Sequence, residues 1–192
     1  AWGNALATAL YGQPMVDSIT GSFDWTVDWR ATPHHARYTR ELARKFEADG
    51  LKENAESFGI IADGIAAAVS AGKPYYRRSR PATPSRETKT SPFEGKVFFL
   101  TDTACASACL DFADIMLRLP NVVHIGLPTL ADAVYIDNYS VDLPSGKASL
   151  STSMKVYRNR VRRNNEWYTP RHLWVGGRMD DAAVAAWVKT LP

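Results

Sequence analysis

The stretch that decides the fold runs from residue 96 to residue 126 and reads KVFFLTDTACASACLDFADIMLRLPNVVHIG. It begins with a continuous apolar run, residues 96–101, which is typical of a strand buried on both faces. Residues 104–119 then carry apolar side chains at helical spacing, and residues 122–126 form a second apolar run. A strand, a helix and a strand with short connections predict a βαβ unit with a right-handed crossover. We therefore expect an α/β fold.

The turn between the first strand and the helix consists of small residues around Ser107. Small neighbours leave its hydroxyl accessible, and the start of a helix supplies positive potential where an oxyanion would form. The N–H of Ala108 is free to donate, because amides in the first turn have no partner within the helix. Serines also begin helices as ordinary N-caps. The turn alone therefore leaves both a nucleophile and a cap open.

The N-terminal half of the chain has a mainly helical pattern. Helical spacing covers residues 2–11, 36–48 and 51–70, whereas residues 23–35 look extended or loop-like. Residues 79–95 are rich in Pro, Ser, Thr and charge, and they predict a long mobile loop.

Beyond residue 126 the pattern is typical of a strand meander. Short strands are expected at residues 139–143, 148–153 and 154–157, and a last helix at residues 180–189.

The composition is that of one ordinary globular domain, with 45% hydrophobic and 22% charged residues in a chain of 192. No apolar window of about 18 residues exists, so no membrane span is predicted. Arginines clustered at residues 77–86 and 158–163 account for the local positive charge. We interpret these clusters as solvated loops, because no nucleic-acid-binding fold or aromatic platform accompanies them.

The two cysteines are Cys105 and Cys109, one on each side of Ser107. They are too few for a zinc site, and no well-spaced histidines add ligands, so no metal is expected. Their spacing permits a disulfide if the backbone is helical or tightly turned. Two buried free thiols are the equal alternative.

Five motifs, in their order and spacing, resemble the S41 family of serine peptidases, which includes the C-terminal processing peptidases and tricorn-like enzymes. The matching segments are the strand and Ser-Ala pair at 96–108, the strand ending in Gly-x-x-Thr at 123–129, the Leu-Pro-x-Gly turn at 143–146, the equivalent of a Gly-x-x-Pro element at 167–170, and the helix after a Gly-Gly-Asn loop at 2–12.

This resemblance implies a ClpP/crotonase-like fold, a mixed sheet with outer helices, and a helical insert at residues 24–78. Residues 1–192 would then be a single incomplete peptidase domain whose nucleophile-bearing core is residues 96–192. The activity implied is that of a serine-type endopeptidase, which hydrolyses peptide bonds through an acyl-enzyme on Ser107.

The resemblance also implies that part of the active site precedes Ala1. Ala108 corresponds to one donor of the oxyanion hole, and the other donor is a glycine of the Gly-Gly loop. Losing one such donor typically lowers the rate about a hundredfold or more. The isolated chain is therefore expected to be inactive or nearly so.

The general base is where the chain departs from the family. Processing peptidases have a lysine three residues after the threonine, whereas Asp132 stands at that distance from Thr129. An aspartate is too weak a base unless its pKa is raised. Tricorn-like enzymes instead use an upstream histidine with an acid before the Gly-x-x-Pro element. Glu166 is the candidate acid, with Asn164 or Asn165 as alternatives for holding the histidine.

The remaining expectations also follow from the resemblance. Thr129 and Tyr135 would line the site for a peptide or protein substrate, no cofactor is implied, and the protein would be periplasmic or secreted in a bacterium. The insert has an apolar face that fits either a lid or an arm of a homo-oligomer. Among the histidines, His124 lies in a buried strand and is interpreted as a core residue.

Two rival functions come from other classes. One is a catalytically inactive S41-like module that binds peptide or lipid, which Asp132 favours. The other is a crotonase-type acyl-CoA enzyme, which Ser107 disfavours because those enzymes rely on two backbone amides at this turn.

Overall fold

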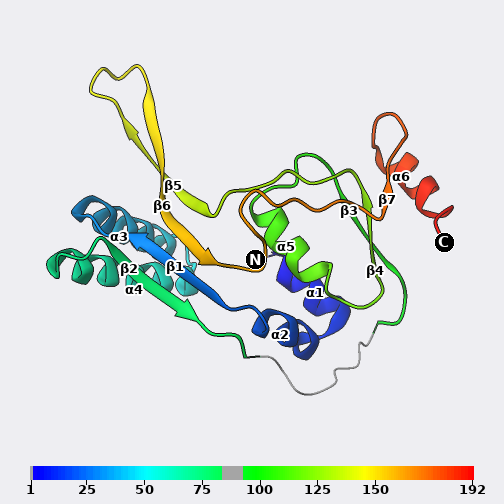
Figure 1. Cartoon of the computed structure of the whole chain (residues 1–192), viewed down its shortest axis with the longest axis horizontal. Helices are drawn as coiled ribbons and strands as arrows, with labels where there is room; N and C mark the ends of the chain where they lie inside the picture. Colours follow the sequence, from blue (N-terminus) through cyan, green and yellow to red (C-terminus); the bar gives the residue numbers. More distant parts are fainter. Residues whose placement is uncertain (1, 84–92) are drawn as a thin grey trace. The chain divides into compact units, whose positions relative to one another are not determined.

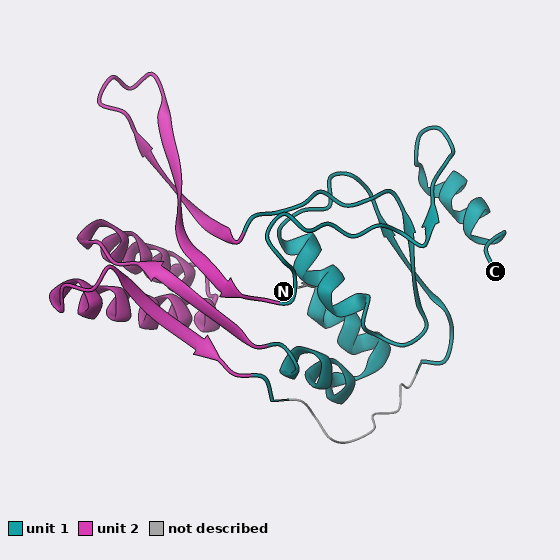
Figure 2. Ribbon diagram, viewed as in Figure 1, with its two compact units in different colours: residues 1–23, 82–133, 161–192 teal, residues 24–81, 134–160 magenta. Residues whose placement is uncertain are grey.

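The computed structural model describes residues 2–83 and 93–192, and it is a mixed α/β structure with one parallel and one antiparallel sheet (Figure 1). The chain forms two compact units (Figure 2). Unit 1 consists of residues 1–23, 82–133 and 161–192, and unit 2 of residues 24–81 and 134–160. Among the described helices, none combines the length and the hydrophobicity that a membrane crossing requires.

Unit 1 is built on a three-stranded parallel sheet with the order β3-β4-β7. β3 (Val97–Thr101) and β4 (Val122–Gly126) pair in parallel, and α5 (Ala108–Met116) connects them. The βαβ unit that the sequence predicts is therefore confirmed. The short strand β7 (His172–Leu173) pairs with the carboxyl end of β4.

The helices α1 (Trp2–Tyr11), α2 (Gln13–Gly21) and α6 (Asp181–Val188) complete unit 1. α1 and α2 pack against each other and against α5. Their shared core comprises Ala7, Tyr11, Val16, Phe99, Ala113, Ile115, Met116 and Leu119. The core thus fixes the helix that begins at the Ser107 turn.

Gly126 ends β4 in a conformation that favours glycine. Its φ is 107°, and a Cβ there would lie 2.2 Å from the carbonyl oxygen of Thr101. The next residue, Leu127, donates its N–H to that same oxygen at 2.8 Å. The close approach brings the segment after β4 alongside the turn after β3.

Unit 2 contains a four-stranded antiparallel sheet with the order β2-β1-β6-β5. Its strands are β1 (Trp25–Arg30), β2 (Tyr75–Arg80), β5 (Tyr135–Asp142) and β6 (Ser149–Asn159). β5 and β6 form one long hairpin, in place of the three short strands that the sequence predicts.

The two long helices, α3 (Pro33–Ala48) and α4 (Lys52–Ser70), cover one face of this sheet (Figure 1). Val27 and Trp29 from the sheet join Ile61 and Ile65 from α4 in one buried cluster. Unit 2 is therefore a helix-on-sheet unit rather than a purely helical insert.

The boundaries that the sequence suggests differ in part from those of the units. Unit 2 begins at residue 24, where the expected insert begins, but it also includes residues 134–160, which the sequence groups with the core. Of the predicted loop at residues 79–95, Ser79 and Arg80 belong to β2, and residues 84–92 lie outside the described part of the chain.

An ion-pair cluster joins three strands of unit 2 on the face that alternates with Val27 and Trp29. The Asp28 carboxylate is 2% exposed and accepts hydrogen bonds from Arg77 Nε at 2.7 Å and Nη2 at 2.9 Å, and from Arg158 Nε at 2.6 Å. Chiefly through the Arg77 hydrogen bond, this cluster lowers the pKa of Asp28 from 3.8 to about 2.

This cluster predicts a specific loss of stability in acid. Because the pKa of Asp28 is lower in the folded state, its stabilisation is complete above pH 3.8 and is lost as the pH falls through about 2. We expect Asp28→Asn to lower the free energy of unfolding by about 2 kcal/mol at neutral pH. Urea unfolding followed by tryptophan fluorescence should show most of this difference gone by pH 2. A stability difference between wild type and Asp28→Asn that is as large at pH 2 as at neutral pH would contradict the lowered pKa of Asp28.

Candidate functional site

The turn that carries Ser107 is closed by hydrogen bonds to the side chain and the backbone of Asp102. The Asp102 side chain accepts a hydrogen bond from the N–H of Ala104 at 2.9 Å, and its carbonyl accepts one from the N–H of Cys105 at 3.2 Å. These contacts reverse the chain directly after β3, so that Ser107 stands immediately before α5.

Ser107 has an unusual backbone conformation for a residue that begins a helix. Its φ is 53° and its ψ is −115°, whereas N-cap residues normally have extended dihedrals. Its side chain makes no capping hydrogen bond, and Ser107 itself is exposed. Conformations of this kind cost about 1–3 kcal/mol and cluster at active sites. The same strained turn between a strand and a helix presents the serine of a nucleophile elbow.

The amide that follows Ser107 is available as a donor. Within the described residues, no group accepts a hydrogen bond from the N–H of Ala108, and Ala108 is exposed. The next amide is engaged, because Cys109 donates to the carbonyl of Ala106 at 3.1 Å. An oxyanion formed beside Ser107 would therefore meet one free N–H at the positive end of α5.

Cys105 and Cys109 form a disulfide, with a distance of 5.3 Å between their Cα atoms. This settles the choice between a disulfide and two free thiols. The covalent ring that it closes contains Ser107.

The segment after β4 lies alongside the Ser107 turn. Leu130 donates its N–H to the carbonyl of Cys105 at 3.0 Å. Thr129 is buried, and its N–H donates to the carbonyl of Tyr168 at 3.0 Å. In return, the Thr129 hydroxyl accepts the N–H of Tyr168 at 2.9 Å. Thr129 therefore joins the segment after β4 to the segment that contains Tyr168. Its hydroxyl oxygen is already engaged as the acceptor of the Tyr168 N–H.

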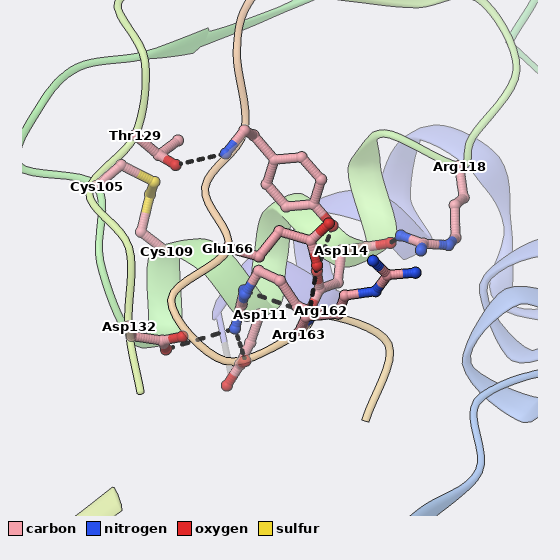
Figure 3. Close-up of polar contacts among 11 residues, drawn as sticks. Cys105, Cys109, Asp111, Asp114, Arg118, Thr129, Asp132, Arg162, Arg163 and Glu166 are labelled. Carbon is pink, nitrogen blue, oxygen red and sulfur yellow. Dashed lines mark hydrogen bonds and ion pairs between the residues drawn. A yellow bond between two sulfur atoms is a disulfide. The ribbon is translucent and has the colours of Figure 1, made fainter. Parts of the chain in front are cut away.

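Asp132 belongs to a buried ionic cluster centred on Arg162. The Arg162 side chain is 0% exposed, and its Nη2 lies 3.4 Å from Asp132 Oδ2 and 3.2 Å from Asp111 Oδ1. Its Nη1 lies 3.5 Å from Asp114 Oδ2. Figure 3 shows the guanidinium of Arg162 with dashed contacts to the carboxylates of Asp111 and Asp132. The cluster ties the loop after β4 to α5, the helix that follows Ser107.

The cluster continues through Tyr168. Its hydroxyl donates a hydrogen bond of 2.6 Å to Asp114 Oδ1. Burial, together with this carboxylate, raises the pKa of Tyr168 above its usual value of 10.0. Tyr168 therefore stays a neutral donor at physiological pH.

Glu166 lies in the same region but is exposed. Its carboxylate accepts the N–H of Arg163 at 2.6 Å, which closes a local turn. The neighbouring Asn165 donates its N–H to the carbonyl of Asp132 at 3.0 Å. In the described part of the chain, no hydrogen bond joins Ser107 to Glu166 or to Asp132.

Tyr135 begins β5 and therefore belongs to unit 2, whereas Ser107 belongs to unit 1. Its side chain is 60% exposed. The expectation that it lines the peptide site stays a prediction.

His124 is a hydrogen-bonded residue of the unit 1 core, as the sequence suggests. Thr101 donates its hydroxyl to the carbonyl of Leu127 at 2.7 Å, so the His124 Nε2, 2.8 Å away, donates to that hydroxyl. Burial lowers the pKa of His124 below 6.5. His124 is therefore neutral and oriented by Thr101.

A surface hollow of about 310 Å³ lies at the Ser107 turn. It is lined by Leu100, Thr101, Asp102, Ala104, Cys105, Cys109 and Met179. The disulfide thus forms part of the wall of a cavity that opens to the surface. Within the described residues, no group of three or more histidines, cysteines or acids has a metal-binding arrangement.

Arg162 is the residue of this region that the sequence alone does not reveal. It stands in an arginine-rich run that is typical of a solvated loop. A signal exists in α5, where Asp111 and Asp114 share a face of an otherwise apolar helix, so that a cation between them would offset the repulsion of their like charges. The sequence does not say which arginine supplies it.

Comparison with protein families finds no family that matches the chain, and comparison with curated proteins finds no relative.

Proposed function

We propose that this chain carries the nucleophile of a serine peptidase of the S41 type, with a ClpP/crotonase-like fold, and that it hydrolyses peptide bonds through an acyl-enzyme on Ser107. The observation that carries the proposal is the backbone of Ser107, with φ 53° and ψ −115° at an exposed turn from strand to helix. A serine whose role was only to cap the helix would need neither this strain nor a hydroxyl free of the helix.

In the proposed reaction, the Ser107 hydroxyl oxygen attacks the carbonyl carbon of the scissile peptide bond while a general base takes its proton. The resulting oxyanion accepts the N–H of Ala108 and a second donor. Collapse of the intermediate breaks the C–N bond, the base returns its proton to the leaving amine, and the acyl group remains on Ser107. Attack by water then releases the acid and restores the serine.

The base is proposed to lie in sequence that precedes Ala1. Asp132, which occupies the position of the family's lysine, is paired with the buried Arg162. Its carboxylate thus contacts a guanidinium and, among the described residues, makes no hydrogen bond to Ser107. Glu166 is exposed, and we propose it as an acid that orients a histidine base.

Location and substrate follow from the same proposal. The substrate is a peptide or a protein segment, and the protein acts in an oxidising compartment such as the periplasm or outside the cell. The Cys105–Cys109 disulfide supports this location, because disulfides persist chiefly in oxidising environments.

A catalytically inactive peptide-binding module is the second candidate. The observation that favours it is the ion pair between Asp132 and Arg162, which places a carboxylate against a buried guanidinium at the position where the family has its lysine. The two candidates differ in whether Ser107 is chemically activated.

Covalent labelling tests the proposal. We expect a fluorophosphonate to add once to the full-length protein, on the peptide that contains Ser107, and to leave the Ser107→Ala variant unlabelled. Ser145→Ala, an exposed serine in the β5–β6 hairpin loop, is the matched control and should label like wild type. A folded protein that forms no adduct would support the binding module instead.

A further inference from the structure

The disulfide encloses the part of the turn that is strained. Cys105 and Cys109 flank Ala106, Ser107 and Ala108, and the bond holds their Cα atoms 5.3 Å apart. Ser107 is the one residue of this ring with a positive φ. A strained conformation persists only where the surrounding structure enforces it.

Backbone hydrogen bonds also restrain the ring, because the N–H of Cys105 donates to the carbonyl of Asp102 at 3.2 Å and the carbonyl of Ser107 accepts the N–H of Asp111 at 3.0 Å. Leu130 donates to the carbonyl of Cys105, and the N–H of Cys109 closes back on the carbonyl of Ala106. The Ser107 side chain adds none, since it makes no capping hydrogen bond, and Ser107 and Ala108 are exposed. The disulfide is therefore the covalent restraint on the nucleophile's backbone.

The disulfide borders a surface hollow. Both cysteines line the surface hollow of about 310 Å³, although Cys105 itself is only 4% exposed. Thiol–disulfide exchange requires an attacking thiolate to reach one sulfur along the bond axis. The hollow provides an approach for a small dithiol.

We propose that the Cys105–Cys109 disulfide is a redox switch that positions Ser107: oxidation holds the serine in its reactive conformation, and reduction by a dithiol releases it. This inference rests on the proposed function. In the exchange, a thiolate of the dithiol forms a mixed disulfide with one cysteine and expels the other as a thiolate. The second thiol of the reductant then closes its own disulfide, so that two electrons and two protons reach the protein.

The test compares oxidised protein with protein treated with dithiothreitol, using two measurements. Fluorophosphonate labelling at Ser107 should slow by about 10- to 100-fold on reduction, because small displacements of a nucleophile have effects of this size. Hydrogen exchange in the peptide covering residues 102–112 should become faster, whereas peptides of α4 in unit 2 should not change. Reoxidation should restore both values. The Cys105→Ala/Cys109→Ala variant should label at the rate of the reduced protein, with or without dithiothreitol.

Each outcome separates this inference from the function on which it rests. Equal labelling of oxidised and reduced protein would overturn the switch and leave the nucleophile in place. Hydrogen exchange at residues 102–112 that does not change on reduction would also overturn the switch, because the disulfide would then not restrain this segment. Faster exchange throughout unit 1 would overturn it as well, because the disulfide would then stabilise the whole unit rather than the Ser107 turn. An oxidised protein that does not label would overturn the proposed function, and the switch with it.

Discussion

Replacing Ser107 with glycine is expected to abolish acyl transfer and, at the same time, to make the protein more stable. Glycine adopts a φ of 53° without the cost that a side chain incurs, so that about 1–3 kcal/mol of strain is released. The greater freedom of glycine in the unfolded chain removes about 0.5–1 kcal/mol of this gain. We expect a net gain of about 1 kcal/mol in the free energy of unfolding, measured in urea. Hydrolysis of an activated ester by the full-length protein should fall by about a thousandfold or more.

Two comparison variants make this result specific. Ser107→Ala should lose the same activity but keep the strain, so its stability should stay within about 0.5 kcal/mol of wild type. Asn121→Gly changes another residue of unit 1 with positive φ, 61°, and it should keep full activity. An ordinary N-cap would behave differently, since alanine would cost about 1 kcal/mol and glycine only a few tenths. That pattern would contradict a strained nucleophile.

Replacing Arg162 with methionine is expected to have the largest effect on stability. The arginine is 0% exposed, and its removal leaves the carboxylates of Asp111, Asp114 and Asp132 without the cation between them. Removing one partner of a buried ionic cluster typically costs about 3–5 kcal/mol. Urea unfolding at neutral pH should show a loss of this size, and hydrogen exchange should show it first in α5.

Arg163→Met is the matched control, because it makes the same substitution one residue further on, at an exposed position. We expect it to change the free energy of unfolding by less than about 0.5 kcal/mol. Arg162→Lys keeps the charge, but a compact ammonium group lacks the planar guanidinium whose several N–H donors contact more than one carboxylate. We therefore expect the free energy of unfolding of Arg162→Lys to lie between those of wild type and Arg162→Met. Equal effects of Arg162→Met and Arg163→Met would contradict the central place of Arg162.

The central βαβ unit could be predicted from sequence because its signals are local. The apolar runs of β3 and β4 are short, continuous and bounded by turn residues, and the helix between them has regular spacing. The same stretch identified Ser107 as the residue at the turn. The backbone dihedrals of Ser107 could not be predicted, because they depend on the disulfide and on the hydrogen bonds that hold the turn.

Other elements escaped prediction because tertiary contacts decide them. β2 has the sequence YYRRSR, whose three arginines are not typical of a strand. It is nevertheless an edge strand, where charged residues are tolerated, and its Arg77 forms an ion pair with Asp28. α2 follows Gly12 and contains Pro14, which resembles a break, yet proline is well tolerated in the first turn of a helix. The pairing of β6 with β1 joins segments more than a hundred residues apart, and no local pattern indicates it.

The buried cluster around Arg162 shows the same limit at the candidate site. Asp132 stands where the S41 processing peptidases, which the sequence resembles, have a lysine, and from sequence alone it is a candidate base. Its partner comes from a distant arginine-rich segment whose four arginines look alike. Only the fold distinguishes the buried Arg162 from the other arginines of the run.

The most direct test of the central claim is to trap the acyl-enzyme itself. The full-length protein would be mixed with p-nitrophenyl acetate, quenched in acid at short times and digested, and the peptide containing Ser107 examined by mass spectrometry. We predict one acetyl group on Ser107 that forms with the first turnover and disappears as the substrate is exhausted. Turnover with no acetyl group on Ser107, or an acetyl group on another residue, would contradict an acyl-enzyme on this serine.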